Sequence, residues 1–159
     1  MRVIRYKTAK LFEAASRLGG ILGGADDEQE NRLAAFGMHL GTAFQIIDDV
    51  LDYSADEAET GKHLGDDLAE GKPTLPLIHV MQKGSADQAA VVRNAIEKGG
   101  RDDFAAVLGA IRATGALDEA RRHARREANL AIDAVSTLPP SNFKDALLKL
   151  SDFAVERNH

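Results

Sequence analysis

The chain has 159 residues, 44% of them hydrophobic and 28% charged, which is the composition of one globular domain with a buried core. It has no cysteine, which excludes disulfides, thiolate catalysis and cysteine-ligated metal sites and permits a reducing cytosol. A net charge of −5 argues against nucleic acid as the main partner. No run approaches the roughly 20 apolar residues of a transmembrane helix, so we expect a soluble, cytoplasmic protein.

Helical periodicity outside the glycine clusters predicts an all-α chain, with residues 1–159 as a single domain without an internal boundary. The first helix is expected to run to about Leu18 and to end at Gly19-Gly20 or Gly23-Gly24. A second helix begins near Asp26-Asp27, where acidic residues favour a helix start, and continues to about Tyr53. Residues 54–72 form a polar loop with room for a short helical turn. Further helices are expected at about 73–83, 86–98, 101–114, 116–137 and 142–157.

Three aspartates interrupt the apolar, helix-periodic end of the second helix. At about 100° per residue, Asp48, Asp49 and Asp52 project with Gln45 onto one side of that helix. Crowded carboxylates repel one another, so they need solvent, protons or a cation, and a site made only of oxygen ligands suits Mg²⁺. By spacing alone, a solvated helix face is an equally good interpretation. The flanking apolar residues favour the metal site.

Lysines accompany the aspartates in two other segments. One segment is Lys7-Thr8 in the first helix. The other runs from Gly61-Lys62 through Asp66-Asp67 to Gly71-Lys72-Pro73-Thr74 in the loop. Because Mg²⁺ commonly binds through one or two carboxylates together with phosphate oxygens, these elements could bracket a diphosphate. Taken singly, each lysine is more typical of an ordinary surface residue. The loop glycines are equally consistent with simple turns and with a mobile flap that closes over a diphosphate.

Taken in order, these segments resemble the trans-type isoprenyl diphosphate synthase, or polyprenyl synthetase, family, in its long-chain, octaprenyl-like branch. A lone Asp-Asp-x-x-Asp motif is weak evidence, but its ordered combination with the other segments is specific. The matching segments are Lys7 to Phe12, Gly41 to Tyr53, Gly61 to Leu68 and Glu70 to Ile78.

The resemblance implies a helical bundle that condenses isopentenyl diphosphate with an allylic diphosphate by Mg²⁺-assisted ionisation. It implies that Asp48, Asp49 and Asp52 bind Mg²⁺, with Asp48 and Asp52 as direct ligands. The site residues that it implies for catalysis and for substrate binding are Lys7 and Lys62 on the allylic diphosphate, Lys72 on substrate, Thr8 and Gln45 beside the reacting centre, and Asp66 as an outer metal contact. The five histidines show no metal-ligand spacing, and we assign none of them a role.

The family's first aspartate-rich motif and its upstream cationic residues have no counterpart in this sequence. We therefore expect a chain that corresponds to the C-terminal half of such an enzyme and is incomplete and inactive alone. Its partners would be the missing N-terminal half or further copies in a homo-oligomer. The alternative is a non-catalytic subunit or assembly module of a heteromeric prenyl synthase. A terpene cyclase is a weaker alternative, because the Lys-Thr and Gly-Lys-Pro-Thr segments argue against it.

Overall fold

The computed structural model describes residues 2–54, 65–99 and 103–157. Across these ranges every regular element is a helix, which confirms the all-α prediction. None of the described helices is both long enough and apolar enough to cross a membrane. The chain divides into two compact units, and the prediction of a single domain stays a prediction.

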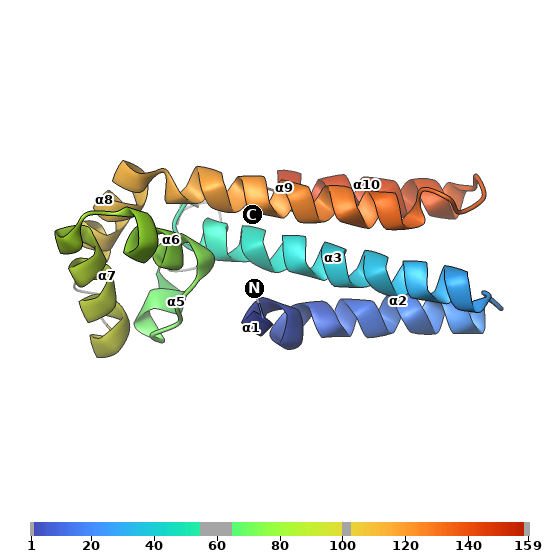
Figure 1. Ribbon diagram of the computed structural model, residues 1–159, viewed down its shortest axis with the longest axis horizontal. Coiled ribbons are helices and arrows are strands. Elements are labelled where there is room, and N and C mark those ends of the chain that lie inside the picture. The colour runs from blue at the N-terminus through green and yellow to red at the C-terminus, as the bar shows by residue number, and fades with distance from the viewer. Residues whose placement is uncertain (1, 55–64, 100–102, 158–159) are drawn as a thin grey trace. The chain divides into compact units, whose positions relative to one another are not determined.

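Unit 1 comprises residues 1–47 and 123–157. Its helices are α1 (Arg2–Ile4), the π-helical turn η1 (Arg5–Ala9), α2 (Lys10–Leu22), the first part of α3 (Asp27–Leu51), most of α9 (Ala116–Val135) and α10 (Asn142–Glu156). Figure 1 shows the long helices of this unit running alongside one another. Its core gathers Phe36 and Leu40 of α3, Ala131 and Val135 of α9, and Ala154 of α10. Helices that are distant in sequence therefore pack together to form the core of unit 1.

Two glycines bring the N-terminal helices close to α3. A Cβ on Gly41 would lie 2.8 Å from the Cα of Ala9 and 2.9 Å from Cγ of Phe12. A Cβ on Gly37, one turn earlier, would collide with the Phe12 carbonyl oxygen. These two positions lie on the same face of α3, since residues four apart are neighbours on a helix. The end of η1 and the start of α2 therefore rest directly on the backbone of α3.

Unit 2 comprises residues 48–122 and 158–159. Its described helices are the last turn of α3, α5 (Asp66–Ala69), α6 (Leu75–Lys83), α7 (Ala86–Lys98), α8 (Phe104–Thr114) and the first turns of α9. Ser85 begins α7 with a reciprocal capping box to Gln88, and Gly99 ends it at a φ of +65°. The core of this unit includes Tyr53, Leu77, Val92 and Ile111, none of them more than 2% exposed.

The predicted helices are found, and the first one ends at Gly23-Gly24, one of its two predicted ends. Helix α2 continues through Gly19-Gly20 to Leu22, and the left-handed residue that follows it is Gly24, at a φ of +74°. The turn from Arg5 to Ala9 is π-helical, which the sequence did not predict. The predicted short turn in the loop is α5, and the predicted helix at 101–114 is α8, which begins at Phe104.

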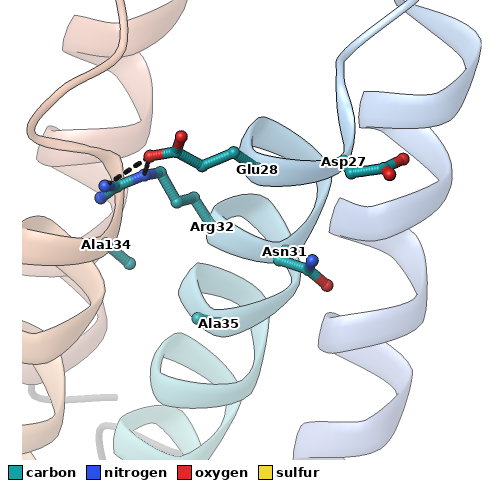
Figure 2. A pocket seen from close by; sticks show the side chains of 6 residues that line it. All are labelled: Asp27, Glu28, Asn31, Arg32, Ala35 and Ala134. Carbon is teal, nitrogen blue, oxygen red and sulfur yellow. Dashed lines mark hydrogen bonds and ion pairs between the residues drawn. The ribbon is translucent and has the colours of Figure 1, made fainter.

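A shallow groove lies at the N-terminal end of α3 in unit 1, and Figure 2 shows the side chains around it. The Glu28 carboxylate accepts hydrogen bonds from Arg32 at 3.0 and 2.9 Å, one turn apart on α3. Asp27 and Glu28 belong to the acidic first turn of that helix. The predicted site residues lie toward the other end of α3, so this groove does not belong to the candidate site.

Candidate functional site

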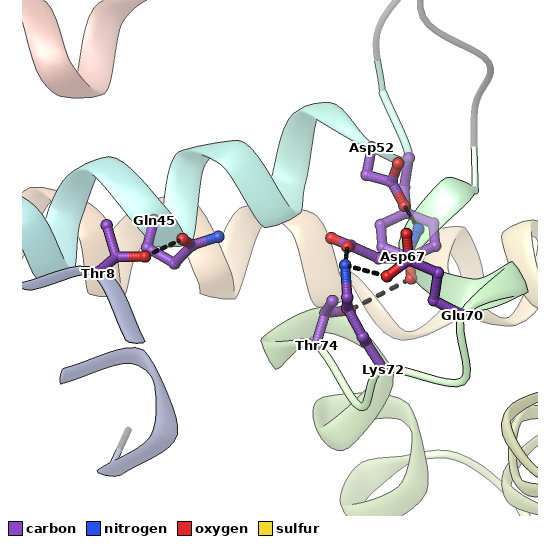
Figure 3. Close-up of polar contacts among 8 residues, drawn as sticks. Thr8, Gln45, Asp52, Asp67, Glu70, Lys72 and Thr74 are labelled. Atoms are coloured by element: carbon purple, nitrogen blue, oxygen red, sulfur yellow. Dashed lines mark hydrogen bonds and ion pairs between the residues drawn. The ribbon is translucent and has the colours of Figure 1, made fainter. Parts of the chain in front are cut away.

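The first group of predicted site residues lies in unit 1, on η1 and α3. The Thr8 hydroxyl donates a 2.6 Å hydrogen bond to Oε1 of Gln45, and Figure 3 shows the two side chains facing each other. Gln45 is only 8% exposed, so its amide is held within the unit. Thr8 sits in a π turn, and such single turns occur frequently at functional sites. The structure therefore joins the two residues that the resemblance assigned to the reacting centre.

Lys7 precedes Thr8 in the same π turn, and its side chain is exposed. Thr8 is tied to α3 through Gln45, and Ala9, at the end of the turn, is fully buried. The backbone that carries Lys7 is thereby anchored while its ammonium group stays accessible to solvent. This combination suits a lysine that binds an anion.

The second group lies in unit 2 and centres on Asp52, just after the end of α3. Its carbonyl oxygen accepts a hydrogen bond from the Gly65 backbone amide at 3.0 Å. Its carboxylate accepts one from the Asp67 backbone amide at 3.3 Å. The segment that begins at Gly65 is therefore bound twice to the same aspartate, which brings α5 beside the end of α3.

Burial first, and then the neighbouring charge of Asp67, raise the pKa of Asp52 from its usual value of 3.8 to about 6. The backbone hydrogen bonds from Asp67 and Asp66 oppose these effects. The ionised side chains of Asp52 and Asp67 repel each other, which raises the free energy of the state in which both are charged. A nearby cation would restore the ionised form.

Lys72 supplies one such cation to this group, as Figure 3 shows. Its ammonium nitrogen lies 2.9 Å from Oδ1 of Asp67 and 2.6 Å from Oε2 of Glu70. The hydrogen bond with Asp67, followed by that with Glu70, raises the pKa of Lys72 above its usual value, so the ammonium is charged at neutral pH. The lysine that the resemblance assigns to substrate is thus held by carboxylates here.

Tyr53 contacts two residues next to this group, Phe104 and Thr74. Its ring stacks on that of Phe104 with the centroids 6.3 Å apart, and its hydroxyl accepts a 3.2 Å hydrogen bond from Thr74. Burial raises the pKa of Tyr53, so the phenol stays neutral. Thr74 follows the Gly-Lys-Pro segment directly, and this contact fixes the segment that carries Lys72.

The remaining predicted residues differ in their accessibility. Asp48 is half-buried on α3, while Asp49 is 5% exposed. Asp66 opens α5. Lys62 lies outside the described residues. Sequence reasoning gave no role to Asp67 or Glu70, the two carboxylates that hold Lys72, because their approach depends on how the chain returns at Gly65.

The carboxylates of unit 2 fit a hard divalent cation in chemistry, since oxygen is the ligand that Mg²⁺ and Ca²⁺ prefer. Within the ranges that the structure describes, no three His, Asp or Glu side chains are grouped closely enough to hold a metal by themselves. Mg²⁺ commonly keeps water and takes phosphate oxygens in addition to one or two carboxylates. The protein residues would therefore supply only part of its coordination shell.

Residues 1–111 match the family model described as polyprenyl synthetase. The chain belongs to the polyprenyl synthetase family. Over the full chain it is 51% identical to an octaprenyl diphosphate synthase of Haemophilus influenzae, covering 49% of that protein. The chain thus spans about half the length of the curated relatives that it matches.

Solved structures of polyprenyl synthetases place the chain in the same fold. A polyprenyl synthase of Caulobacter crescentus, crystallised with calcium and isoprenyl diphosphate, superposes with a TM-score of 0.91 at 37% identity. The match covers 99% of this chain and 48% of that one. A decaprenyl diphosphate synthase of Rhodobacter capsulatus superposes with a TM-score of 0.89 at 39% identity, covering 99% and 49% of the two chains. The fold prediction is confirmed.

Proposed function

We propose that this chain is part of a prenyltransferase that condenses isopentenyl diphosphate with an allylic diphosphate into a long-chain, octaprenyl-like polyprenyl diphosphate. The observation that carries the proposal is the cluster in unit 2, where Asp67 binds the Asp52 carboxylate through its backbone amide and the Lys72 ammonium group through its side chain. Carboxylates whose negative charge is only partly neutralised can bind a metal ion. A neighbouring lysine that exchanges a carboxylate for a phosphate can bind the diphosphate. The long-chain relatives supply the product class.

In this proposal Asp48, Asp49 and Asp52 hold Mg²⁺. When bound, Mg²⁺ would act as a Lewis acid that neutralises the negative charge of the diphosphate leaving group. Asp52 is the residue best suited to this role, because a cation would offset the cost of ionising its half-buried carboxylate. Calcium in the Caulobacter crescentus structure is a related hard cation.

The lysines are proposed to hold diphosphate oxygens. Lys7 is exposed on an anchored turn, and Lys72 can exchange its carboxylate partners for phosphate. Lys62 is assigned to the same ligand on the resemblance. Thr8 and Gln45 form one hydrogen-bonded pair. We propose that this pair lies beside the reacting carbon atoms and orients polar groups there, and that neither residue acts as a nucleophile.

We propose that catalysis needs more than this chain, since the relatives that it matches are about twice as long. The chain corresponds in this view to their C-terminal half. The residues that hold isopentenyl diphosphate would then come from the other half, whether on the same polypeptide or on a separate subunit. This chain would keep a measurable affinity for Mg²⁺ and diphosphate.

Calorimetric titration of the chain with inorganic pyrophosphate in the presence of Mg²⁺ tests the proposal. We expect binding that EDTA abolishes and that Asp52→Asn weakens at least about tenfold, because a direct ligand is lost. Asp87→Asn, which changes an exposed aspartate in the first turn of α7, should leave the affinity unchanged. Equal binding by wild type and Asp52→Asn would contradict the proposed role of the aspartates.

A condensation assay with farnesyl diphosphate, isopentenyl diphosphate and Mg²⁺, read by mass spectrometry, tests whether the chain is sufficient. We expect no elongated product from the folded chain alone. Product that disappears in Asp52→Asn would show that this half suffices. Pyrophosphate binding without condensation is the combination that the proposal predicts.

A further inference from the structure

Glu127 of α9 is a carboxylate inside unit 1 to which the proposed function gives no role. It is only 8% exposed. A buried carboxylate is costly unless positive or hydrogen-bonding partners accompany it. Its two oxygens meet different partners from different parts of the chain.

The first partner of Glu127 is His39 of α3. Nδ1 of His39 lies 2.7 Å from Oε2 of Glu127, although the residues are 88 positions apart in sequence. With a proton on Nδ1, His39 donates to the carboxylate whether the ring is neutral or charged. This contact fixes the direction of the carboxylate relative to α3.

The second partner of Glu127 is Arg5, the first residue of η1. Nη2 of Arg5 lies 3.9 Å from Oε1 of Glu127, and the arginine side chain remains about half exposed. The π turn is therefore held at three points. Arg5 is attracted to Glu127, Thr8 is hydrogen-bonded to Gln45, and Ala9 rests on Gly41. Lys7 lies between these points.

We propose that Glu127 is a positioning residue for the π turn, and that His39 in turn orients Glu127. A π turn closes i→i+5 hydrogen bonds in place of the i→i+4 bonds of an α-helix, and it is rare outside single turns within α-helices. The Glu127 carboxylate supplies such a contact at the first residue of the turn. The inference rests on the proposed function, because the turn carries Lys7 and Thr8.

A purely structural role makes a different prediction for the same residues. If Glu127 only joins α3 to α9 through His39, its loss lowers the stability of unit 1 as a whole and leaves Arg5 irrelevant. If it positions the turn, loss of Glu127 and loss of Arg5 should have the same local effect. The conservative variant Arg5→Lys, which keeps the positive charge, should then restore the behaviour of the wild type.

The experiment compares four variants with the wild-type chain: Glu127→Gln, Arg5→Met, Arg5→Lys and the control Glu156→Gln. The control removes an exposed carboxylate of the same unit, which lies 3.1 Å from Arg125. Amide hydrogen exchange is followed in the segment 3–9. Pyrophosphate affinity in Mg²⁺ and the denaturation midpoint are measured in parallel.

We expect Glu127→Gln and Arg5→Met to speed exchange in this segment and to weaken pyrophosphate binding by about two- to fivefold, the scale of one lost ion-pair contact. Arg5→Lys and Glu156→Gln should behave like the wild type. A lower denaturation midpoint in Glu127→Gln, with exchange in the segment unchanged, would overturn the inference. If the wild-type chain binds no pyrophosphate, the proposed function fails, and the exchange measurement still decides whether Glu127 orders the turn.

Discussion

Asp52 ionises less readily than a free aspartate, because burial and the charge of Asp67 raise its pKa from 3.8 to about 6. The folded chain therefore binds this proton more tightly than the unfolded chain does. The resulting stabilisation is fully present below pH 3.8 and is lost as the pH rises through 6. At pH 8 without metal, ionised Asp52 should cost the fold about 1–2 kcal/mol, because solvent screens part of the effect on its half-exposed carboxylate.

Asp52→Asn should accordingly stabilise the metal-free chain by about 1 kcal/mol at pH 8 and by much less at pH 4. Asparagine keeps an oxygen that can accept the hydrogen bond from the Asp67 backbone amide. Urea denaturation at the two pH values checks this prediction, with Asp87→Asn as the control. A variant that is less stable than wild type at pH 8 would show that the ionised carboxylate is not a burden.

At the scale of single residues, the sequence predicted some of the contacts and missed others. It placed Thr8 and Gln45 at one centre, and the structure joins them directly. It assigned an outer role to Asp66 and none to Asp67, although Asp67 bonds to Asp52 and holds Lys72. Adjacent acids in a loop look alike in sequence, and only the return of the backbone at Gly65 distinguishes them.

Among the helices, α3 and α2 offer a matched pair of glycine substitutions, Gly41 and Gly19. Gly41→Ala should destabilise the chain by about 1–3 kcal/mol, because its Cβ would press on the backbone of Ala9 and the ring of Phe12. Gly19→Ala should instead stabilise it by about 0.5–1 kcal/mol, since a Cβ there meets nothing within 4 Å. Thermal unfolding of both variants measures the difference. Equal effects would contradict the close packing of α2 on α3.

Helix α5 depends on Gly65, which precedes it at a φ of +78°. A Cβ on this residue would lie 2.5 Å from Cδ2 of Phe104. Gly65→Ala should therefore cost about 2–4 kcal/mol from backbone strain and the clash together. The control is Gly109→Ala within α8, which has open space around it and should be neutral or stabilising. Urea denaturation that gives both variants the same free energy of unfolding would contradict this account.

The helices themselves were largely predictable, and their exceptions have physical causes. Helices α6, α7 and α10 follow their predicted limits closely, because proline, serine and glycine signals stand at their ends. Gly19-Gly20 does not end α2, since close packing of Gly20 against Leu33 compensates for the low helix propensity of glycine. The π turn η1 was not predicted. Its residues Thr8 and Ala9 contact Gln45 and Gly41, which are distant in sequence.

Unit 1 as a body exposes an apolar stripe on α2, formed by Leu11, Leu18 and Leu22. Their exposed fractions are 73%, 57% and 87%, and their spacing places them on one face of the helix. Exposed apolar side chains are ordinary when scattered, whereas a continuous stripe favours association. We propose that a second copy of the chain covers this stripe when no other polypeptide does.

Sedimentation velocity over a range of protein concentrations checks this prediction. We expect concentration-dependent association of the wild-type chain and a shift toward monomer in the double variant Leu11→Gln/Leu22→Gln. Ala90→Gln changes an exposed residue of unit 2 and serves as the control. A monodisperse monomer at every concentration would exclude the stripe as an association surface.

The ion pairs of Lys72 carry a thermodynamic consequence for the order in which ligands bind. A cation that binds at Asp52, beside Asp67, is opposed by the ammonium that Asp67 holds, and a diphosphate that draws Lys72 away leaves Asp67 uncompensated. Each ligand alone therefore works against a cost that the other removes. The two should bind with positive cooperativity, and the factor by which Mg²⁺ raises pyrophosphate affinity must equal the factor by which pyrophosphate raises Mg²⁺ affinity. Lys72→Met would shrink that shared factor while strengthening the binding of Mg²⁺ alone, so the resting chain would lose its selectivity for the metal–diphosphate pair over the free ion.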